Sequence, residues 1–345
     1  MRAPEVSFAL IATTIVLLGH GQVEAQYAGP TLACGGTSLV KTTTLIAPAN
    51  AGTNGVTCVY TIRALNLRIC QLRLDFNSFS LAQPTLDPYP VCINDALTVQ
   101  NMDFNLCGEN SGQHVYVPFS PTSADRTLTI TFRIASRSHI PTLGNPHWSV
   151  RVQQLECPAG MPMAMRALLL PEPQPQLEPQ ARTHHTDLGL LAPAGCLQYF
   201  SEPSGTVESF NLGNGAGGVG PYLGGLNYAI CFQRGRTSRS LRLSMSTFEI
   251  ASSADPTDGN VGFDELCYSN IPLQVRSEDN LHIPNAVFQL PSFPLLRAER
   301  FCSRSLMNAN VDVTSAGPFV MYFNSDRLYE ATRPEVGFRL QYQVL

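Results

Sequence analysis

Apolar and polar residues alternate with a period of two along much of the chain. In residues 69–76, one face carries Cys70, Leu72, Leu74 and Phe76, while the other carries Gln71, Arg73 and Asp75. The same alternation recurs over residues 56–62, 128–134, 148–152, 241–245, 319–323 and 336–344. This period is typical of half-buried antiparallel strands, and no segment after residue 25 has a convincing amphipathic helical pattern. The pattern therefore predicts an all-β protein.

A proline-rich segment divides the chain into two halves. Residues 158–193 contain the run PEPQPQLEP, which favours extended polyproline II and excludes a strand ladder or a helix interior. Strand patterns lie on both sides of it. We therefore expect two antiparallel β-sandwich domains, over residues 26–157 and 194–345, joined by a linker over residues 158–193.

The first 25 residues have the pattern of a signal peptide. Arg2 is followed by the apolar run FALIATTIVLLG over residues 8–19, and Val23-Glu24-Ala25 supplies a cleavage site before Gln26. The alternative is a membrane anchor, but the run is short, and no later segment reaches the roughly 18 apolar residues of a span. The sequence therefore predicts a secreted, extracellular protein with no membrane span.

The net charge and the cysteine count indicate which partners and which covalent links to expect. The 345 residues carry a formal net charge of −4 and ten cysteines. An acidic balance disfavours a nucleic-acid partner, and an even cysteine count in a secreted chain predicts disulfides. The split of six and four lets each half close its own bridges, although spacing alone leaves their pairing open. The six are Cys34, Cys58, Cys70, Cys92, Cys107 and Cys157, and the four are Cys196, Cys231, Cys267 and Cys302.

The motifs of the first half resemble those of the CUB domain family. Its cysteines open the motifs Cys34-Gly35-Gly36, Cys58-Val59-Tyr60-Thr61-Ile62, Cys92-Ile93-Asn94-Asp95-Ala96-Leu97-Thr98-Val99 and, after Leu106, Cys107-Gly108. The chain also resembles arthropod secreted proteins with two tandem CUB-like domains. The resemblance implies a jelly-roll sandwich with the bridges Cys34–Cys58 and Cys92–Cys107.

The second half resembles the same family more loosely. Its corresponding motifs are Tyr228-Ala229-Ile230-Cys231, Asp279-Asn280-Leu281-His282-Ile283, Phe301-Cys302-Ser303 and Phe323-Asn324-Ser325-Asp326. The bridges that this resemblance implies are Cys196–Cys231 and Cys267–Cys302. The second half is thus expected to be a divergent CUB-like domain.

Cys70 and Cys157 remain in the first half and most simply form a third bridge. Alternation places Cys70 inward with Leu72 and Leu74. However, it places Cys157 out of phase with Trp148 and the residues that share its face. A β-bulge near residues 153–154 would restore the phase.

The resemblance raises the question of whether either half binds a calcium ion. Many CUB domains hold calcium with one glutamate and two aspartates, which are the hard oxygen ligands that this ion prefers. The first half supplies Asp95 alone, with Ala135-Ser136 where a second aspartate belongs, so no site is expected there. The second half keeps Asp279 and Asp326, which makes calcium conceivable in that domain only.

The remaining polar clusters favour binding over catalysis. The sequence has no metalloprotease, phosphate-loop or serine-hydrolase motif, and His114 and His282 are expected at exposed strand positions, so we expect no enzyme activity. Arg234, Arg236 and Arg239 are candidates for binding a sulfated glycan or an acidic partner, or else they belong to a hairpin turn around Gly235. We therefore expect a non-catalytic binding protein for extracellular proteins or glycans. The alternatives are a structural matrix or cuticle component and a regulatory partner of a secreted serine protease.

Overall fold

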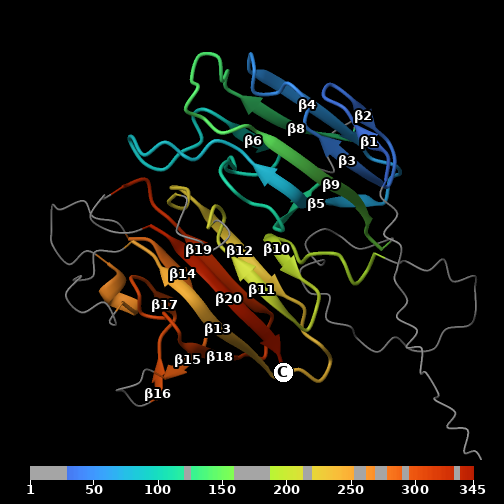
Figure 1. Ribbon diagram of the computed structural model, residues 1–345. Coiled ribbons are helices and arrows are strands. Elements are labelled where there is room, and N and C mark those ends of the chain that lie inside the picture. Colours follow the sequence, from blue (N-terminus) through green and yellow to red (C-terminus); the bar gives the residue numbers. More distant parts are fainter. Residues whose placement is uncertain are drawn as a thin grey trace, which may run out of the picture.

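The chain folds into two β-sandwiches that lie one above the other in Figure 1. This computed structural model describes residues 29–119, 126–158, 187–212, 220–251, 262–268, 278–289, 295–329 and 335–345. The all-β prediction is confirmed, and the helical element of these residues is the short 3₁₀ helix η3, Asp264–Cys267. The expected signal peptide and residues 159–186 of the expected linker lie outside the described residues. No helix of the described part is long and apolar enough to cross a membrane.

The first domain packs a five-stranded sheet on a four-stranded sheet. In spatial order, the larger sheet contains β1 (Thr31–Leu32), β3 (Thr42–Ile46), β9 (His147–Glu156), β5 (Ile69–Ser80) and β7 (His114–Pro118). The smaller contains β2 (Thr37–Ser38), β4 (Val56–Arg63), β8 (Thr127–Ile134) and β6 (Ala96–Val99). Trp148 stacks on Phe132 between the two sheets, with 4.3 Å between ring centroids. The alternating strands therefore enclose the core that their pattern predicts.

The second domain repeats this architecture with more strands. One sheet contains β10 (Cys196–Phe200), β12 (Asn227–Phe232), β19 (Phe319–Asn324), β14 (Asn280–His282) and β17 (Arg300–Phe301). The other contains β11 (Ser204–Glu208), β20 (Gly337–Val344), β13 (Ser240–Glu249), β18 (Asn310–Thr314), β15 (Ala286–Gln289) and β16 (Leu295–Arg297). The strand β20 lies between β11 and β13 and is therefore paired on both sides within its sheet.

All ten cysteines form disulfides, and the pairs are those expected from the sequence. They are Cys34–Cys58, Cys70–Cys157, Cys92–Cys107, Cys196–Cys231 and Cys267–Cys302. Each bridge stays within one domain, so none of them fixes the two domains to each other. Contacts between the domains must therefore come from non-covalent packing.

The expected direction of Cys70 is wrong, and the reason is a β-bulge. The register between β5 and β9 shifts between Ile69 and Gln71, so the bulge lies at Cys70 on β5 rather than at residues 153–154 on β9. Ile69 and Leu72 both face the sandwich core, while Cys70 packs in a separate cluster with Leu155. The bulge thus turns the Cys70–Cys157 bridge out of the core and toward the second domain.

The two domains meet where an edge strand of each lies beside the other. β7 is an edge of its sheet, β10 is an edge of its own, and the two strands are in contact. A second apolar cluster joins the outer faces of the two sheets; its buried members are Cys70, Tyr116, Leu155, Cys157, Leu191, Ala192, Tyr199, Ala229 and Cys231. Docking covers two exposed edges that would otherwise be open to pairing with other chains.

Residues 187–193, placed in the linker by the sequence, pack on the first domain. The buried Asp187 accepts hydrogen bonds from Lys41 Nζ at 2.9 and 2.8 Å, and the Gln71 side chain bonds the backbone of Ala192 at 2.7 and 3.0 Å. The spacer is therefore shorter than the predicted 158–193, because its C-terminal part belongs to the interface between the domains.

Limited proteolysis is expected to cut first between Met161 and Thr186. Prolines deny this stretch a strand ladder, and exposed polar segments are the preferred sites of nicking. The two fragments, near residues 26–160 and 187–345, are expected to elute together in gel filtration, because cleavage leaves the non-covalent interface between the domains intact. Early cleavage inside either half would contradict the division into two domains.

Candidate functional site

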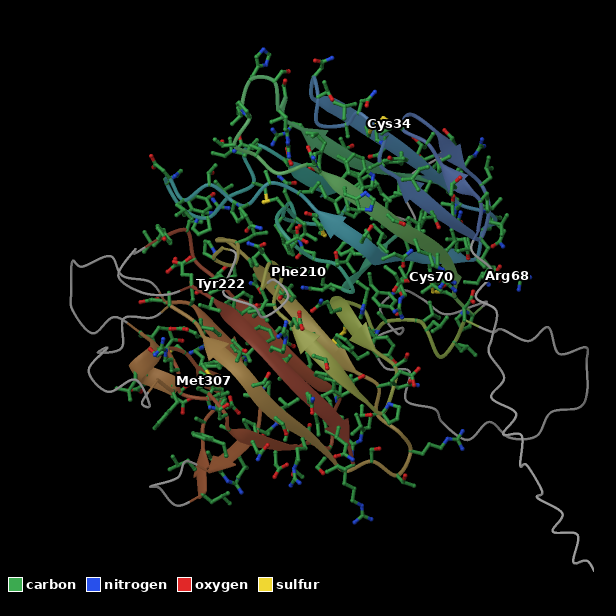
Figure 2. The ribbon with its side chains drawn as sticks, in the orientation of Figure 1. Cys34, Arg68, Cys70, Phe210, Tyr222 and Met307 are labelled. Carbon is green, nitrogen blue, oxygen red and sulfur yellow. A yellow bond between two sulfur atoms is a disulfide. The ribbon has the colours of Figure 1, made fainter. Side chains whose placement is uncertain are left out.

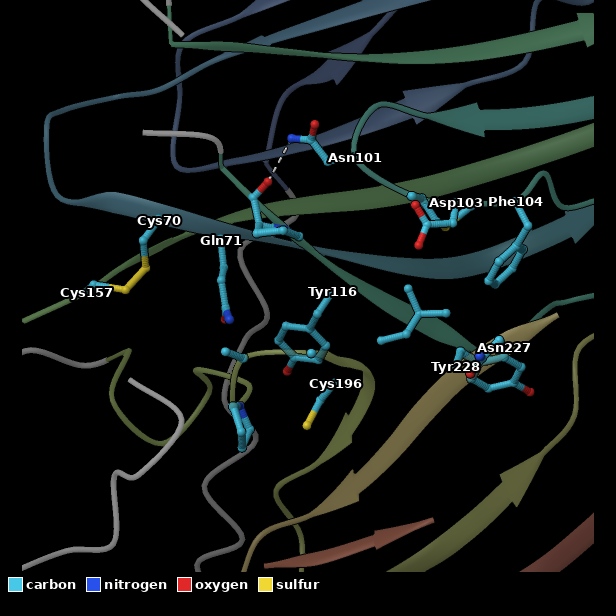
Figure 3. Close-up of a pocket in the computed structure, with 16 residues that line it drawn as sticks. Cys70, Gln71, Asn101, Asp103, Phe104, Tyr116, Cys157, Cys196, Asn227 and Tyr228 are labelled. Carbon is cyan, nitrogen blue, oxygen red and sulfur yellow. Dashed lines mark hydrogen bonds between the residues drawn. A yellow bond between two sulfur atoms is a disulfide. The ribbon is translucent and has the colours of Figure 1, made fainter. Parts of the chain in front are cut away.

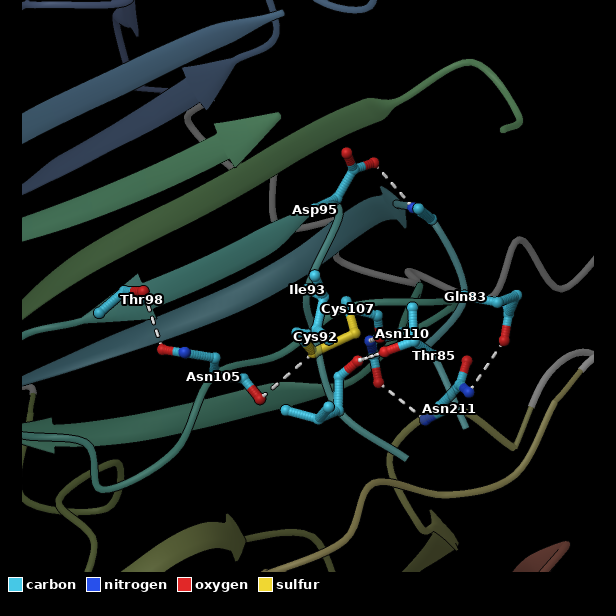
Figure 4. Close-up of a disulfide and its surroundings, with 12 residues drawn as sticks. Gln83, Thr85, Cys92, Ile93, Asp95, Thr98, Asn105, Cys107, Asn110 and Asn211 are labelled. Atoms are coloured by element: carbon cyan, nitrogen blue, oxygen red, sulfur yellow. Dashed lines mark hydrogen bonds between the residues drawn. A yellow bond between two sulfur atoms is a disulfide. The ribbon is translucent and has the colours of Figure 1, made fainter. Parts of the chain in front are cut away.

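Asp95 of the first domain is held by an arginine. Arg137 Nη1 donates to Asp95 Oδ1 at 2.7 Å, and Arg137 Nη2 donates to Oδ2 at 2.5 Å. The backbone nitrogens of Ala82 and Ala135 donate to the same two oxygens at 2.8 and 3.0 Å. Figure 4 shows Asp95 and its bond to residue 82 close to the Cys92–Cys107 disulfide. Four donors therefore engage this carboxylate, which does not fit the role of a calcium ligand.

Sequence reasoning missed Arg137, although a signal was present. The loop after β8 places Ala135-Ser136 where the family pattern has an acid, and a basic residue follows directly. The side chain of Asp95 is completely buried and that of Arg137 is 9% exposed. The buried guanidinium thus joins the loops at this end of the sandwich, as a bound metal ion would.

The two acids singled out in the second domain do lie together. The buried Asp279 accepts hydrogen bonds from Tyr222 Oη at Oδ2 and from the Asp326 backbone nitrogen at Oδ1, both at 2.6 Å. Asp326 in turn accepts bonds from the backbone nitrogens of Glu278 and Leu328, both at 2.8 Å. Burial raises the pKa of Tyr222 well above its ordinary value, and Asp279 and Glu335 raise it further.

Two converging carboxylates do not make a metal centre by themselves. In the described residues, no group of three or more His, Cys, Asp or Glu side chains is placed to hold a metal ion. Calcium takes six to eight oxygen ligands, of which the charged ones set its affinity. The side chains of the described residues therefore do not reproduce the three-carboxylate set of many CUB domains.

The three arginines Arg234, Arg236 and Arg239 differ in their contacts. Arg234 donates to the carbonyl oxygens of Ser238, Ser315 and Gly317 and lies over the Phe319 ring, so its charge serves the loop itself. Arg236 and Arg239 are exposed. A turn around Gly235 is present, with Ser238 N bonded to Gly235 O. However, the flanking β12 and β13 belong to different sheets, so this turn is not a hairpin.

Asn211 is the polar centre of the interface between the domains. Its side chain accepts a bond from Glu109 N at 2.9 Å and donates to Gln83 Oε1 and Pro221 O at 3.0 and 2.8 Å. Its backbone nitrogen donates to Asn110 Oδ1 at 2.9 Å. Figure 4 shows Asn211 reaching from the second domain into this corner of the first. One buried residue therefore bonds three segments of the chain.

His114 is also part of the interface, which corrects the expectation of an exposed strand position. It is 8% exposed, and its Nε2 lies 2.9 Å from the carbonyl oxygen of Tyr199 in the second domain. Its ring meets Tyr116 and Phe200 edge to face. Burial, aided by the Arg73 guanidinium and opposed by Asp75, lowers the pKa of His114 to about 4. The docked state therefore favours the neutral imidazole.

Docking of the domains is expected to weaken on acidification. The second domain contributes to the burial that lowers the pKa of His114, so the separated state is expected to have the higher pKa and to bind the proton first. Docking is therefore strongest at neutral pH and is expected to weaken as pH falls through the pKa of the separated state toward about 4. Small-angle scattering between neutral pH and pH 4 measures the separation. The same titration of His114→Gln should be flatter, and an identical titration would contradict this assignment.

A cavity of about 330 Å³ lies between the domains. The first domain contributes Gln71, Asn101, Met102, Asp103, Phe104, Tyr116 and Pro118, and the second contributes residues 193–197, Asn227 and Tyr228, with the Cys70–Cys157 bridge at one end (Figure 3). Asp103 is exposed and has no ion-pair partner in the described part of the chain. A carboxylate, amides and aromatic rings together suit a sugar ring or the polar side chain of a partner. Sequence reasoning did not foresee this cavity, because it exists only after docking.

The family of the second domain is shown by comparison with family models. Residues 193–345 match the model of the animal CUB domain. The second domain is therefore a CUB domain, although its motifs resemble the family more loosely than those of the first half. The matched region does not include the first domain. No curated protein matches the sequence.

Several solved structures resemble the chain at low identity. The CUB1-EGF-CUB2 fragment of rat MASP-1 has 12% identity and a TM-score of 0.24, covering 91% of this chain and 100% of that one. The same fragment of human MASP-1/3 has 13% identity and a TM-score of 0.24, covering 89% and 100%. The Ca²⁺-bound CUB2 domain of MASP-1 has 19% identity and a TM-score of 0.25, covering 35% and 98%.

Proposed function

We propose that this chain is a secreted, non-catalytic binding protein that recognises proteins or glycans outside the cell. CUB domains are typically extracellular modules of protein interaction, and the second domain is one of them. Five closed disulfides suit an oxidising compartment. Both observations support the proposal for the chain as a whole.

The observation that carries the proposal is the cavity between the domains. Its lining comes from both domains, so it exists only in the docked chain. The side chains of Asp103 and Asn227 supply polar groups at its surface, and Phe104 and Tyr228 supply apolar walls. Sites of this composition orient a ligand through a few polar contacts.

The contacts of two histidines, His114 and His282, support a non-catalytic role. His114 contacts a backbone carbonyl and aromatic rings rather than a nucleophilic side chain. His282 stacks on Tyr322, with its Nε2 3.7 Å from Glu299. Neither arrangement is the nucleophile–base pair that acyl transfer requires.

The test is capture of a ligand from extracellular fluid on the immobilised full chain, followed by titration with the purified ligand. Asp103→Ala is expected to weaken saturable binding by tenfold or more if the carboxylate bonds the ligand, at roughly 1.5–3 kcal/mol for a charged hydrogen bond. Asp312→Ala is the control, because Asp312 lies on β18 outside the cavity and is half exposed. Equal affinities of the two variants would contradict the assignment. Recovery of a catalytic chain, or self-association alone, would favour the protease-partner or matrix alternatives.

Calcium is expected to leave the melting temperature of the first domain unchanged. A ligand that binds only the folded state stabilises it in proportion to ln(1 + [L]/Kd), and Asp95 is already engaged by Arg137. Calorimetry of the full chain with millimolar calcium and with a chelator measures the effect. A rise that disappears in Asp326→Ala would instead assign calcium to the second domain, where Asp279 and Asp326 converge.

A further inference from the structure

Four aliphatic side chains are exposed at one end of the first domain. Leu39 and Val40 are 50% and 42% exposed, and Leu65 and Leu67 are 46% and 83% exposed. Leu67 is the most exposed large apolar residue of the described chain. We call these four residues the apolar end. Exposed apolar residues gathered in one place, unlike scattered ones, call for an explanation.

The two loops that carry the apolar end are fastened to each other by Gln154. This side chain is buried on β9, and its Nε2 donates to the carbonyl oxygens of Val40 and Arg63 at 3.0 and 2.9 Å. Its Oε1 accepts a bond from the backbone nitrogen of Leu65 at 2.8 Å. Because one amide bonds both loops, residues 39–40 and 63–65 are neighbours despite their separation in sequence.

Further bonds hold these loops in place. Asn66 Oδ1 accepts a bond from Arg68 N, and Asn66 Nδ2 donates to Glu156 Oε1, both at 2.8 Å. The Lys41–Asp187 ion pair adjoins Val40 in the other loop. The apolar end is thus fixed before any partner arrives, which lowers the entropy lost on binding.

The charge around the apolar end is positive. Arg63 and Arg68 are exposed, and neither guanidinium has an ion-pair partner among the described residues. Figure 2 shows Arg68 at the margin of the first domain. Asp187 is paired with Lys41, and Glu156 keeps its negative charge because it bonds the neutral amide of Asn66, so the two arginines leave this end with a net positive charge. This end therefore presents aliphatic side chains on the loops that also carry Arg63 and Arg68, neither of which has an ion-pair partner among the described residues.

We propose that the apolar end docks on the surface of an anionic phospholipid bilayer, with Leu67 inserted among the lipids and Arg63 and Arg68 at the phosphates. Protein hot spots favour aromatic residues seated in pockets, whereas these four residues are aliphatic, lie on loops and do not line the cavity between the domains. A bilayer accepts protruding aliphatic groups without a matching cavity. Basic side chains beside them bind anionic headgroups while their stems remain in apolar surroundings.

The test is sedimentation of the full chain with vesicles of phosphatidylcholine alone and with about 30% phosphatidylserine. Binding is expected to the anionic vesicles only and to fall when salt rises from about 0.05 to about 0.5 M. Leu67→Ser is expected to lower the partition coefficient about tenfold, from the loss of one buried leucine side chain. Arg63→Gln and Arg68→Gln are each expected to lower it about fivefold.

The matched control is Leu295→Ser, because Leu295 is 68% exposed and lies on β16 of the second domain. This variant should bind vesicles like the unaltered chain. An absence of binding to anionic vesicles, or equal binding of Leu67→Ser and Leu295→Ser, would overturn the proposal. Loss of binding in the arginine variants alone would also overturn it, because the attraction would then involve no insertion.

Fluorescence gives an independent measurement of insertion. Trp148 is the only tryptophan and is fully buried, so Leu67→Trp adds the single exposed reporter. Its emission is expected to shift to the blue on anionic vesicles and to be quenched by lipids brominated in the acyl chains. Blue-shifted emission without vesicles and no quenching by them would show that a protein surface covers this end, and would reject the bilayer.

Discussion

Asn211→Ala is expected to separate the two domains while leaving each of them folded. The change removes the acceptor of Glu109 N and the donor to Gln83 Oε1, both in the first domain. Buried polar groups left without partners cost about 1–3 kcal/mol each. Asn211 also has a φ of 63°, in the left-handed region that asparagine tolerates better than alanine. The two lost bonds to the first domain are expected to weaken docking by about 2 kcal/mol or more, whereas the backbone strain destabilises the second domain itself.

The measurement uses a specific protease site placed within residues 161–186. After cleavage, the two halves of the unaltered chain should elute together in gel filtration, whereas those of Asn211→Ala should elute apart. Asn285→Ala is the control, because Asn285 has a similar φ of 58° but lies at an exposed turn in the second domain. Joint elution of the Asn211→Ala halves would show that docking does not depend on the bonds of the Asn211 side chain.

Gly108 tests the same contact from the first domain. A Cβ atom at this position would lie 1.9 Å from Asn211 Oδ1, and the residue has a φ of +73°. Gly108→Ala is therefore expected to displace Asn211 and to separate the halves in the same assay. The glycine of the Leu-Cys-Gly motif thus has a role in docking, which its place in the motif does not reveal.

The strands could be predicted because each depends on neighbouring residues in the sequence. The alternation in residues 128–134 follows from one face being buried, and β8 is observed over Thr127–Ile134. Cys70 marks the limit of this reasoning. The phase error at Cys157 was visible in the sequence, but alternation does not say which of two paired strands carries the bulge.

The interface could not be predicted because it depends on docking rather than on local pattern. His114 occupies a strand position like many exposed ones, and only the approach of Tyr199 buries it. Asp187 follows a proline-rich run, and nothing in the neighbouring sequence indicates that it is buried. Its burial accompanies the ion pair with the distant Lys41. Residues of this kind define the cavity and the orientation of the domains, so the candidate site was less predictable than the fold.

Arg137→Ala is expected to destabilise the first domain by about 3–5 kcal/mol, the usual cost of removing one partner of a buried ion pair. The carboxylate of Asp95 would keep two backbone donors but lose its only counter-ion in the described residues. Asp95→Ala is expected to cost a similar amount, because it leaves the buried guanidinium without its counter-ion and two backbone nitrogens without their acceptor. The double variant should cost less than the sum of the two, since neither charge then remains alone.

Calorimetry of the full chain measures these losses in the transition of the first domain. Arg242→Ala is the control, because the Arg242–Asp312 pair is about half exposed on each side and is expected to leave that transition unchanged. The melting temperature of Arg137→Lys should lie between those of Arg137→Ala and the unaltered chain, because lysine keeps the charge but loses the bidentate contact with Asp95. Calcium is not expected to restore Arg137→Ala, because the ion needs several oxygen ligands and Asp95 supplies one carboxylate. Full rescue by calcium would show that the arginine occupies a working metal site, and a melting temperature equal to that of the unaltered chain would show that the pair contributes nothing.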